Sequence, residues 1–231
     1  MSSKMLYRLS GGALLVGSPL FVLFLVFFSL LFGTPYDVSD PQKLMSSLWL
    51  FVNVVLLVAT LLAAIGLPGV YARQAARMGW LGFFGFGLLF VAVLMMGVFN
   101  QLFAVFVLPW LATTVPNTTV SIAADKPPLL ALFLISGVML LVGAIFFGLA
   151  TIRAGILPRG ASLTLIISSV LVLIGTLPIP TPDLFQNVFD TIAGILFALA
   201  FTWLGYALWS EQRAESKQPD KVPQPATDLH V

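Results

Sequence analysis

The sequence predicts an all-α fold, a single polytopic membrane bundle of six transmembrane helices, and three observations carry this prediction. Hydrophobic residues make up 59% of the 231-residue chain, and the mean hydropathy is +1.05. Charged residues make up only 9%, which is too few to cover the surface of a soluble domain of this length. Six apolar runs are each long enough to cross a bilayer, because a hydrocarbon core of ~30 Å needs about 20 helical residues.

The six runs define a transmembrane domain over residues 1–210. The first run follows Lys4 and Arg8, as in a secretory signal, but it is too long for one and no small-residue cleavage site follows it. We therefore interpret it as an uncleaved helix. The third run exceeds the required length by about ten residues, so its last part, 102–110, is expected to tilt, kink or lie along the outer surface. The expected crossings cover residues 11–32, 46–71, 79–110, 129–152, 161–179 and 185–209.

The crossings form three successive hairpins with similar joints, in which a glycine and an arginine lie close together. This pattern fits a threefold repeat of one out-and-back unit, and it also fits the ordinary placement of glycine and arginine at the cytoplasmic end of any hairpin. After the last crossing the composition changes to Glu, Lys, Gln, Pro and Asp. Residues 211–231 are therefore expected to form a disordered cytoplasmic tail, whose first residues extend the last helix by a turn or two.

The basic residues predict the orientation of the bundle, because Lys and Arg in short loops are retained on the cytoplasmic side. Nine of the 11 basic residues fall on one side of the predicted bundle, and among them Arg73, Arg77, Arg153 and Arg159 determine the topology. Both termini are therefore expected in the cytoplasm of a cell whose inner membrane the chain crosses several times. The net charge of +2 is explained by this asymmetry, so the expected partner is the lipid bilayer and no nucleic acid.

The sequence offers no catalytic, cofactor-binding or metal-binding constellation. It contains no cysteine, and its one histidine, His230, is next to last in the predicted tail. Asp37 and Asp40 of the first outer loop are interpreted as a solvated turn, although a helix cap or a loose calcium site would also use such a pair. No phosphate-binding glycine loop or serine nucleophile motif is present. We therefore expect a protein that is not an enzyme and has no cofactor.

Four polar residues are predicted at similar depth near the outer membrane boundary: Asn53, Asn100, Gln101 and Asp190. Ionisable groups inside a membrane are costly and usually functional, and Asp190 is the only candidate within a predicted crossing. One interpretation is a vestibule open to the outside, in which Asp190 attracts a cation or a polar solute. The other is that these residues mark helix ends and bond to backbone groups.

The densest glycine cluster, Gly79, Gly82 and Gly85, begins the third crossing. Small residues at such spacing let helix backbones approach closely in lipid, so we interpret the cluster as a packing surface, with a hinge or a homodimer face as the alternative. The joints at residues 66–79 and 149–160 resemble turns of uncharacterised six-helix bacterial membrane proteins. This resemblance implies an inner-membrane setting and six helices, and it assigns no activity.

Two functions are compatible with these observations. The first is a scaffold, accessory or sensory subunit that acts through helix packing on a membrane-protein partner or a second copy of the chain. The alternative is a small transporter or lipophile-binding protein in which the three hairpins surround a central cavity. A membrane enzyme that uses Asp190 ranks third. The positions of four hydroxyl groups distinguish these two functions. Convergence on a central cleft favours transport, and scatter over the bundle favours a scaffold. The four residues are Ser136, Ser168, Ser169 and Thr202.

Overall fold

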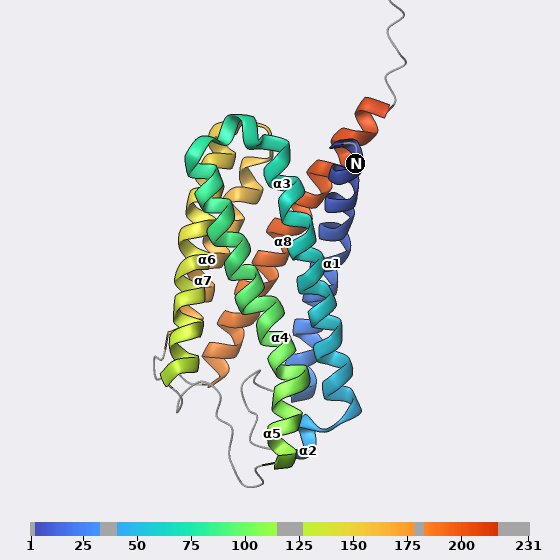
Figure 1. Cartoon of the computed structure of the whole chain (residues 1–231), viewed down its shortest axis with the longest axis vertical. Coiled ribbons are helices and arrows are strands. Elements are labelled where there is room, and N and C mark those ends of the chain that lie inside the picture. Colours follow the sequence, from blue (N-terminus) through green and yellow to red (C-terminus); the bar gives the residue numbers. More distant parts are fainter. Residues whose placement is uncertain (1–2, 33–40, 115–126, 178–182, 217–231) are drawn as a thin grey trace, which may run out of the picture.

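The computed structural model describes residues 3–32, 41–114, 127–177 and 183–216, and these residues are almost entirely helical, with no β-strand among them. The predicted all-α fold class is therefore confirmed (Figure 1). The elements in chain order are α1 (Ser3–Phe32), α2 (Pro41–Leu44), α3 (Ser47–Val93), the π-helix η1 (Leu94–Phe99), α4 (Asn100–Leu102), the π-helix η2 (Phe103–Val107), α5 (Leu108–Thr114), α6 (Pro127–Ala154), α7 (Arg159–Thr176) and α8 (Asp183–Ser216).

Four described helical stretches are long and apolar enough to cross a membrane, and they indicate a membrane-embedded protein. They cover Met5–Phe28, Ser47–Leu111, Ala131–Ala154 and Val188–Ser210. α7 contributes a shorter apolar stretch, Arg159–Gly175. The second stretch has 65 residues, about three times the ~20 that a single crossing needs.

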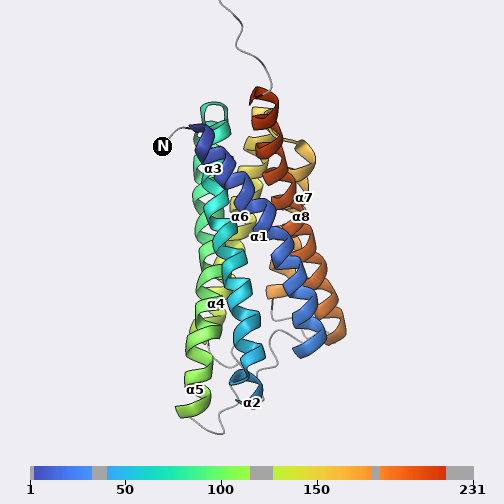
Figure 2. The same ribbon diagram turned by 90° about the vertical axis from the view of Figure 1, so that its right-hand side faces the viewer.

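A reversal of the backbone explains the length of that second stretch. Gly79 has φ 60° and ψ −160°, so the helix is interrupted there, and Figure 1 shows the ribbon of α3 turning back at one end of the bundle. This backbone conformation is accessible to glycine and strained for residues with a Cβ atom. We call the two arms α3a (residues 47–78) and α3b (residues 80–93). The start of α1, the α6–α7 turn and the end of α8 lie at the same end of the bundle as Gly79 (Figures 1 and 2).

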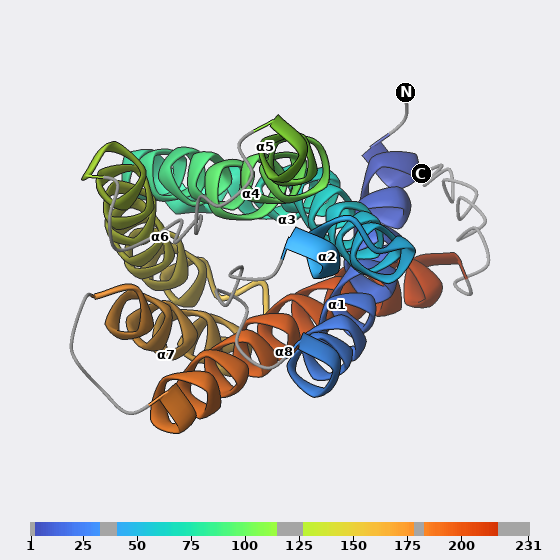
Figure 3. The same ribbon diagram turned by 90° about the horizontal axis from the view of Figure 1, so that it is seen from below.

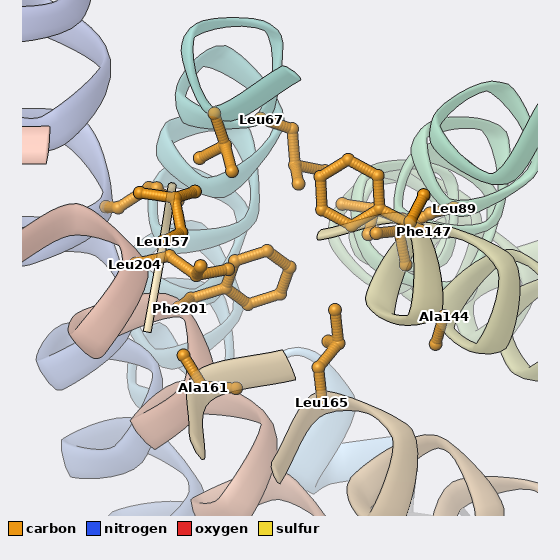
Figure 4. Packing of buried hydrophobic residues seen from close by; sticks show 14 of the residues in the cluster. Leu67, Leu89, Ala144, Phe147, Leu157, Ala161, Leu165, Phe201 and Leu204 are labelled. Carbon is orange, nitrogen blue, oxygen red and sulfur yellow. The ribbon is translucent and has the colours of Figure 1, made fainter. Parts of the chain in front are cut away.

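The helices form a closed ring when viewed along the bundle (Figure 3). α1 packs against α3, α3 against α6, α6 against α7 and α7 against α8, and α8 returns to pack against α1. The half of the ring nearer Gly79 is filled by large apolar side chains. Figure 4 shows this packed region, to which several helices contribute buried leucine and phenylalanine residues: Leu67, Leu89, Phe147, Leu165, Phe201 and Leu204.

Close contacts between glycines and neighbouring backbones join the helices. A Cβ atom on Gly11 of α1 would lie 3.1 Å from the Gly205 carbonyl oxygen of α8, and a Cβ atom on Gly205 would lie 3.0 Å from that of Gly11. Gly85 of α3b lies directly against the α6 backbone at Phe147, so the two helices pack backbone to backbone there. Gly82 differs, because the space beside it is taken by the Met78 side chain. In lipid, small residues commonly allow helix backbones to approach this closely.

Candidate functional site

A cavity of about 180 Å³ lies inside the ring, and every long helical segment of the ring contributes to its wall. α1, α3a, α3b with η1, α6, α7 and α8 all supply lining residues. The cavity adjoins the packed region on the side away from the Gly79 end, and Ala92, Val93, Leu140 and Phe201 belong to both. The lining includes Gly17, Ser18, Thr60, Ala92, Met96, Gly97, Leu140, Val172, Gly194, Phe197, Ala198 and Phe201.

The cavity exists because small side chains face inward where the helices converge. α8 presents Gly194 and Ala198 at a four-residue spacing, and α3a presents Ala59 and Ala63 in the same way. Residues four apart lie on one face of a helix, so each pair leaves a continuous strip of the helix surface without large side chains. η1 supplies Met96 and Gly97, and π-helical turns of this kind are frequent at functional sites.

The wall is apolar and carries no charged side chain. Phe197 and Phe201 form an edge-to-face pair, with ring centroids 4.6 Å apart, on the α8 side. The volume is slightly larger than the roughly 150 Å³ of an apolar protein cavity that binds benzene. A small ring or a short alkyl segment therefore matches the cavity in both size and polarity.

Two hydroxyl-bearing residues line the cavity, and neither donates a hydrogen bond across it to another described residue. Thr60 Oγ1 donates to the carbonyl oxygen of Leu57, at 3.0 Å, within its own helix. Ser18 Oγ is covered and has no hydrogen-bond partner among the described residues. The lining is therefore almost entirely apolar, with the Ser18 hydroxyl as a buried polar group that has no partner among the described residues.

The hydroxyls singled out from the sequence scatter over the bundle. Each donates to a carbonyl of its own helix: Ser136 to Leu132 (2.7 Å), Ser168 to Leu165 (2.9 Å), Ser169 to Ile166 (2.8 Å) and Thr202 to Ala198 (2.8 Å). None of the four lines the central cavity. Thr202 instead lines a separate recess of about 460 Å³ beside Trp203 and Tyr206. This arrangement argues against a polar pathway through the ring.

The four polar residues predicted at the outer boundary belong to two different parts of the structure. Asn53 is buried and its Nδ2 donates to the Trp49 carbonyl, at 2.9 Å, in the manner expected of a polar group that bonds to its own backbone. Gln101 is buried, and its Oε1 has no partner within the described part of the chain, whereas the neighbouring Asn100 is half-buried. Asp190 lies on α8 with its carboxylate against Gly175 of α7. The predicted outer layer is therefore split into two groups. Asn53, Asn100 and Gln101 lie on the α3–α5 side, and Asp190 lies on the α7–α8 side.

A buried polar pair near the Gly79 end was not identified from the sequence. Gln74 and Thr151 are both 0% exposed, and Gln74 Nε2 donates to Thr151 Oγ1 at 3.0 Å. Thr151 Oγ1 in turn donates to the Phe147 carbonyl at 2.8 Å. Sequence reasoning placed Gln74 in the joint after residue 71, and only the continuation of α3a to the Gly79 reversal brings it inside. Arg73 and Arg77 indicated a cytoplasmic joint between two crossings, and Gln74 lies within that joint in the sequence.

The arginines expected to determine the topology lie near the turns at the Gly79 end. Arg77, Arg153 and Arg159 are exposed, and Arg73 is half-buried with its guanidinium 5.9 Å from the centre of the Tyr7 ring. Arg8 lies over the Trp209 ring at 5.8 Å, which joins the start of α1 to the end of α8. The acidic pair Asp37 and Asp40, the tail beyond Ser216 and His230 lie outside the described residues. Within the described ranges, no group of three His, Cys, Asp or Glu residues is placed to hold a metal.

The fold and the site define a class: an all-helical protein with apolar helices of membrane-spanning length that surround an apolar cavity. Comparison with models of protein families, with curated proteins and with solved structures finds no match. The chemistry of the ring is therefore the basis for assigning a function.

Proposed function

We propose that the chain crosses the inner membrane six times, with both termini in the cytoplasm. The reversal at Gly79 supports two crossings by the 65-residue stretch Ser47–Leu111. α7 has 18 residues, about 27 Å at ~1.5 Å per residue, which is close to the thickness of the hydrocarbon core. The exposed arginines beside the turns at the Gly79 end support a cytoplasmic position for that end. The ring order is compatible with three successive hairpins.

Within this topology, the function that the geometry supports best is binding of a small lipophilic molecule, or of the apolar part of a larger one, without catalysis. The observation that carries this proposal is the apolar cavity walled by every long segment of the ring. Binding sites for small molecules are commonly found between the helices of a bundle and are mostly apolar. The ligand reaches such a site from the bilayer, in which lipophilic molecules are concentrated.

The second candidate is a scaffold, accessory or sensory subunit that acts on a membrane-protein partner or a second copy of the chain. The scatter of the four predicted hydroxyls favours this candidate over a transporter for polar solutes. A membrane enzyme using Asp190 has no comparable support. Lipophile binding and a scaffold role are compatible, because an occupied cavity would stabilise the ring that a partner contacts.

Native mass spectrometry of the protein, gently extracted from its own host membrane, tests the proposal. We expect a stoichiometric lipophilic adduct on the wild type and its loss from Ala92→Phe, because Ala92 is fully buried in the cavity wall and the larger side chain fills the space. Ala131→Phe is the matched control, since Ala131 is exposed on α6. An adduct that persists equally in both variants would place the ligand elsewhere, and a co-purifying protein with an empty cavity would favour the scaffold.

A further inference from the structure

We propose that the ligand is an amphiphilic cation, with its charged head group at Asp190 and its apolar tail in the central cavity. This inference rests on the proposed lipophile site and specifies its ligand class. It joins two features of the structure, the apolar cavity and the Asp190 carboxylate, which lies against Gly175 in the seam between α7 and α8.

The first step is the position of Asp190 on α8. Gly194, Phe197, Ala198 and Phe201 follow one another at spacings of three, one and three residues, and all line the cavity. Asp190 precedes Gly194 by four residues, so it continues the same face of the helix, about 6 Å further from the Gly79 end. Helical side chains lean toward the N-terminus, which carries the carboxylate slightly beyond the cavity.

The second step is the position of the same carboxylate relative to α7. Gly175 contacts Asp190, and a Cβ atom at position 175 would occupy the space that the carboxylate takes. Val172, three residues before Gly175, lines the cavity on this helix. On both helices, therefore, the cavity-lining residues lie nearer the Gly79 end of the bundle, and the position of the carboxylate lies one turn further from that end.

The third step is the charge balance. A carboxylate inside a membrane is costly unless an opposite charge or several hydrogen bonds accompany it. Among the described side chains, no ion pair with Asp190 is formed, and most of the basic groups lie at the opposite, Gly79 end of the bundle. Lys43, on α2, belongs to the other side of the ring, where α2 packs against α3 and α5. A ligand cation would supply the opposite charge that no described side chain supplies at Asp190.

The size of the cavity limits the tail. A volume of about 180 Å³ matches a short alkyl chain or one aromatic ring. The head group is expected to be an ammonium or a similar compact cation, because the seam at Gly175 is narrow. The matched neutral molecule would share the tail contacts and lack only the attraction to Asp190.

The test compares hexylamine with hexanol, each carrying a terminal trifluoromethyl group, on the full chain in phosphatidylcholine nanodiscs. Fluorine NMR reports a protein-bound tail separately from the probe dissolved in lipid, and empty nanodiscs give the reference. We expect the amine to bind the wild type about tenfold more tightly than the alcohol, which corresponds to ~1.4 kcal/mol of additional attraction. Asp190→Asn should remove this preference and leave the alcohol unchanged.

Three further variants separate the possible failures. Asp183→Asn removes a carboxylate from the same helix two turns earlier, and an equal loss there would overturn a specific role for Asp190. Gly175→Ala keeps the charge but displaces the carboxylate, so it should also weaken the amine, even if Asp190→Asn fails to fold. Ala92→Phe should abolish the bound signal of both probes. If the alcohol shows this cavity-dependent binding and the amine binds no more tightly, only the cation proposal is contradicted. If neither probe binds the wild type, the proposed lipophile site is contradicted as well.

Discussion

The indole Nε1 of Trp49 donates a hydrogen bond of 3.1 Å to the backbone carbonyl oxygen of Ala104, and it joins the start of α3a to η2. In a π-helix each carbonyl accepts from the amide five residues later, and the fifth residue after Ala104 is Pro109, which has no N–H group. The Ala104 carbonyl would otherwise be left without a donor in an apolar setting. Trp49 thus supplies the hydrogen bond that the proline removes.

Replacing Trp49 with phenylalanine should therefore destabilise the protein by about 1–3 kcal/mol, since a buried carbonyl is left unsatisfied while most of the aromatic contact area stays. Unfolding in mixed micelles, followed by tryptophan fluorescence or circular dichroism, measures the change. Trp110→Phe is the control, because Trp110 is 61% exposed. Equal effects of the two substitutions would contradict a specific role for the Trp49 hydrogen bond.

The Gln74–Thr151 hydrogen bond predicts a coupling between α3a and α6. Gln74→Leu and Thr151→Val should each destabilise the bundle, and the double variant should be less destabilised than the sum, because both polar groups are then removed together. Cycles of this kind in membrane proteins give about 0.6 kcal/mol and at most ~1.7 kcal/mol. Additive single effects in the same unfolding assay would mean that the two side chains do not interact.

Gly79→Ala should be markedly more harmful than Gly87→Ala. Both positions have open space for a methyl group, so crowding is not the difference between them. Gly79 has the positive φ of the reversal, where a Cβ atom costs roughly 1–3 kcal/mol, whereas alanine at the helical position 87 is expected to be neutral or stabilising. Thermal unfolding of the two variants provides the comparison, and a tolerated Gly79→Ala would mean that the reversal has another backbone solution.

The proposed topology predicts the labelling of single cysteines, which are unambiguous because the native chain contains none. Ala76→Cys, beside the Gly79 turn, should react with a membrane-impermeant maleimide only after the cells are permeabilised. Thr113→Cys, at the exposed end of α5, should react in intact cells. The reverse pattern would invert the bundle, and labelling of both positions from outside would disprove the two crossings of the 65-residue stretch.

Several features of the fold could be predicted from single residues and runs. A bilayer requires every backbone polar group to be satisfied within the segment, so long apolar runs predict helices directly. Gly79 and its neighbouring arginines marked the joint where the backbone reverses. The same reasoning ended the second crossing at residue 71, because Arg73 and Arg77 indicate a cytoplasmic joint. The burial of Gln74 was therefore not predicted.

The candidate site was less accessible to sequence reasoning. Asp190 was identified by its charge, yet its contact with Gly175 depends on how α7 and α8 are rotated against each other. In the sequence, the cavity residues Gly194, Ala198 and Gly97 resemble ordinary packing positions. Ser136 and Ser168 were considered as cleft residues, but they do not line the cavity. In lipid, polarity does not distinguish a side chain that faces the ring from one that faces acyl chains.

The sequence by itself determined the all-α class, the apolar helices of membrane-spanning length and the separation of basic residues, because each follows from the length and charge of a continuous segment. The tertiary structure decided that α8 closes the ring on α1, that small side chains leave a cavity at its centre and that the Asp190 carboxylate packs against Gly175 of α7. The physical reason is that helix rotation and close packing depend on shape, and the two faces of an apolar helix in a bilayer differ little in composition.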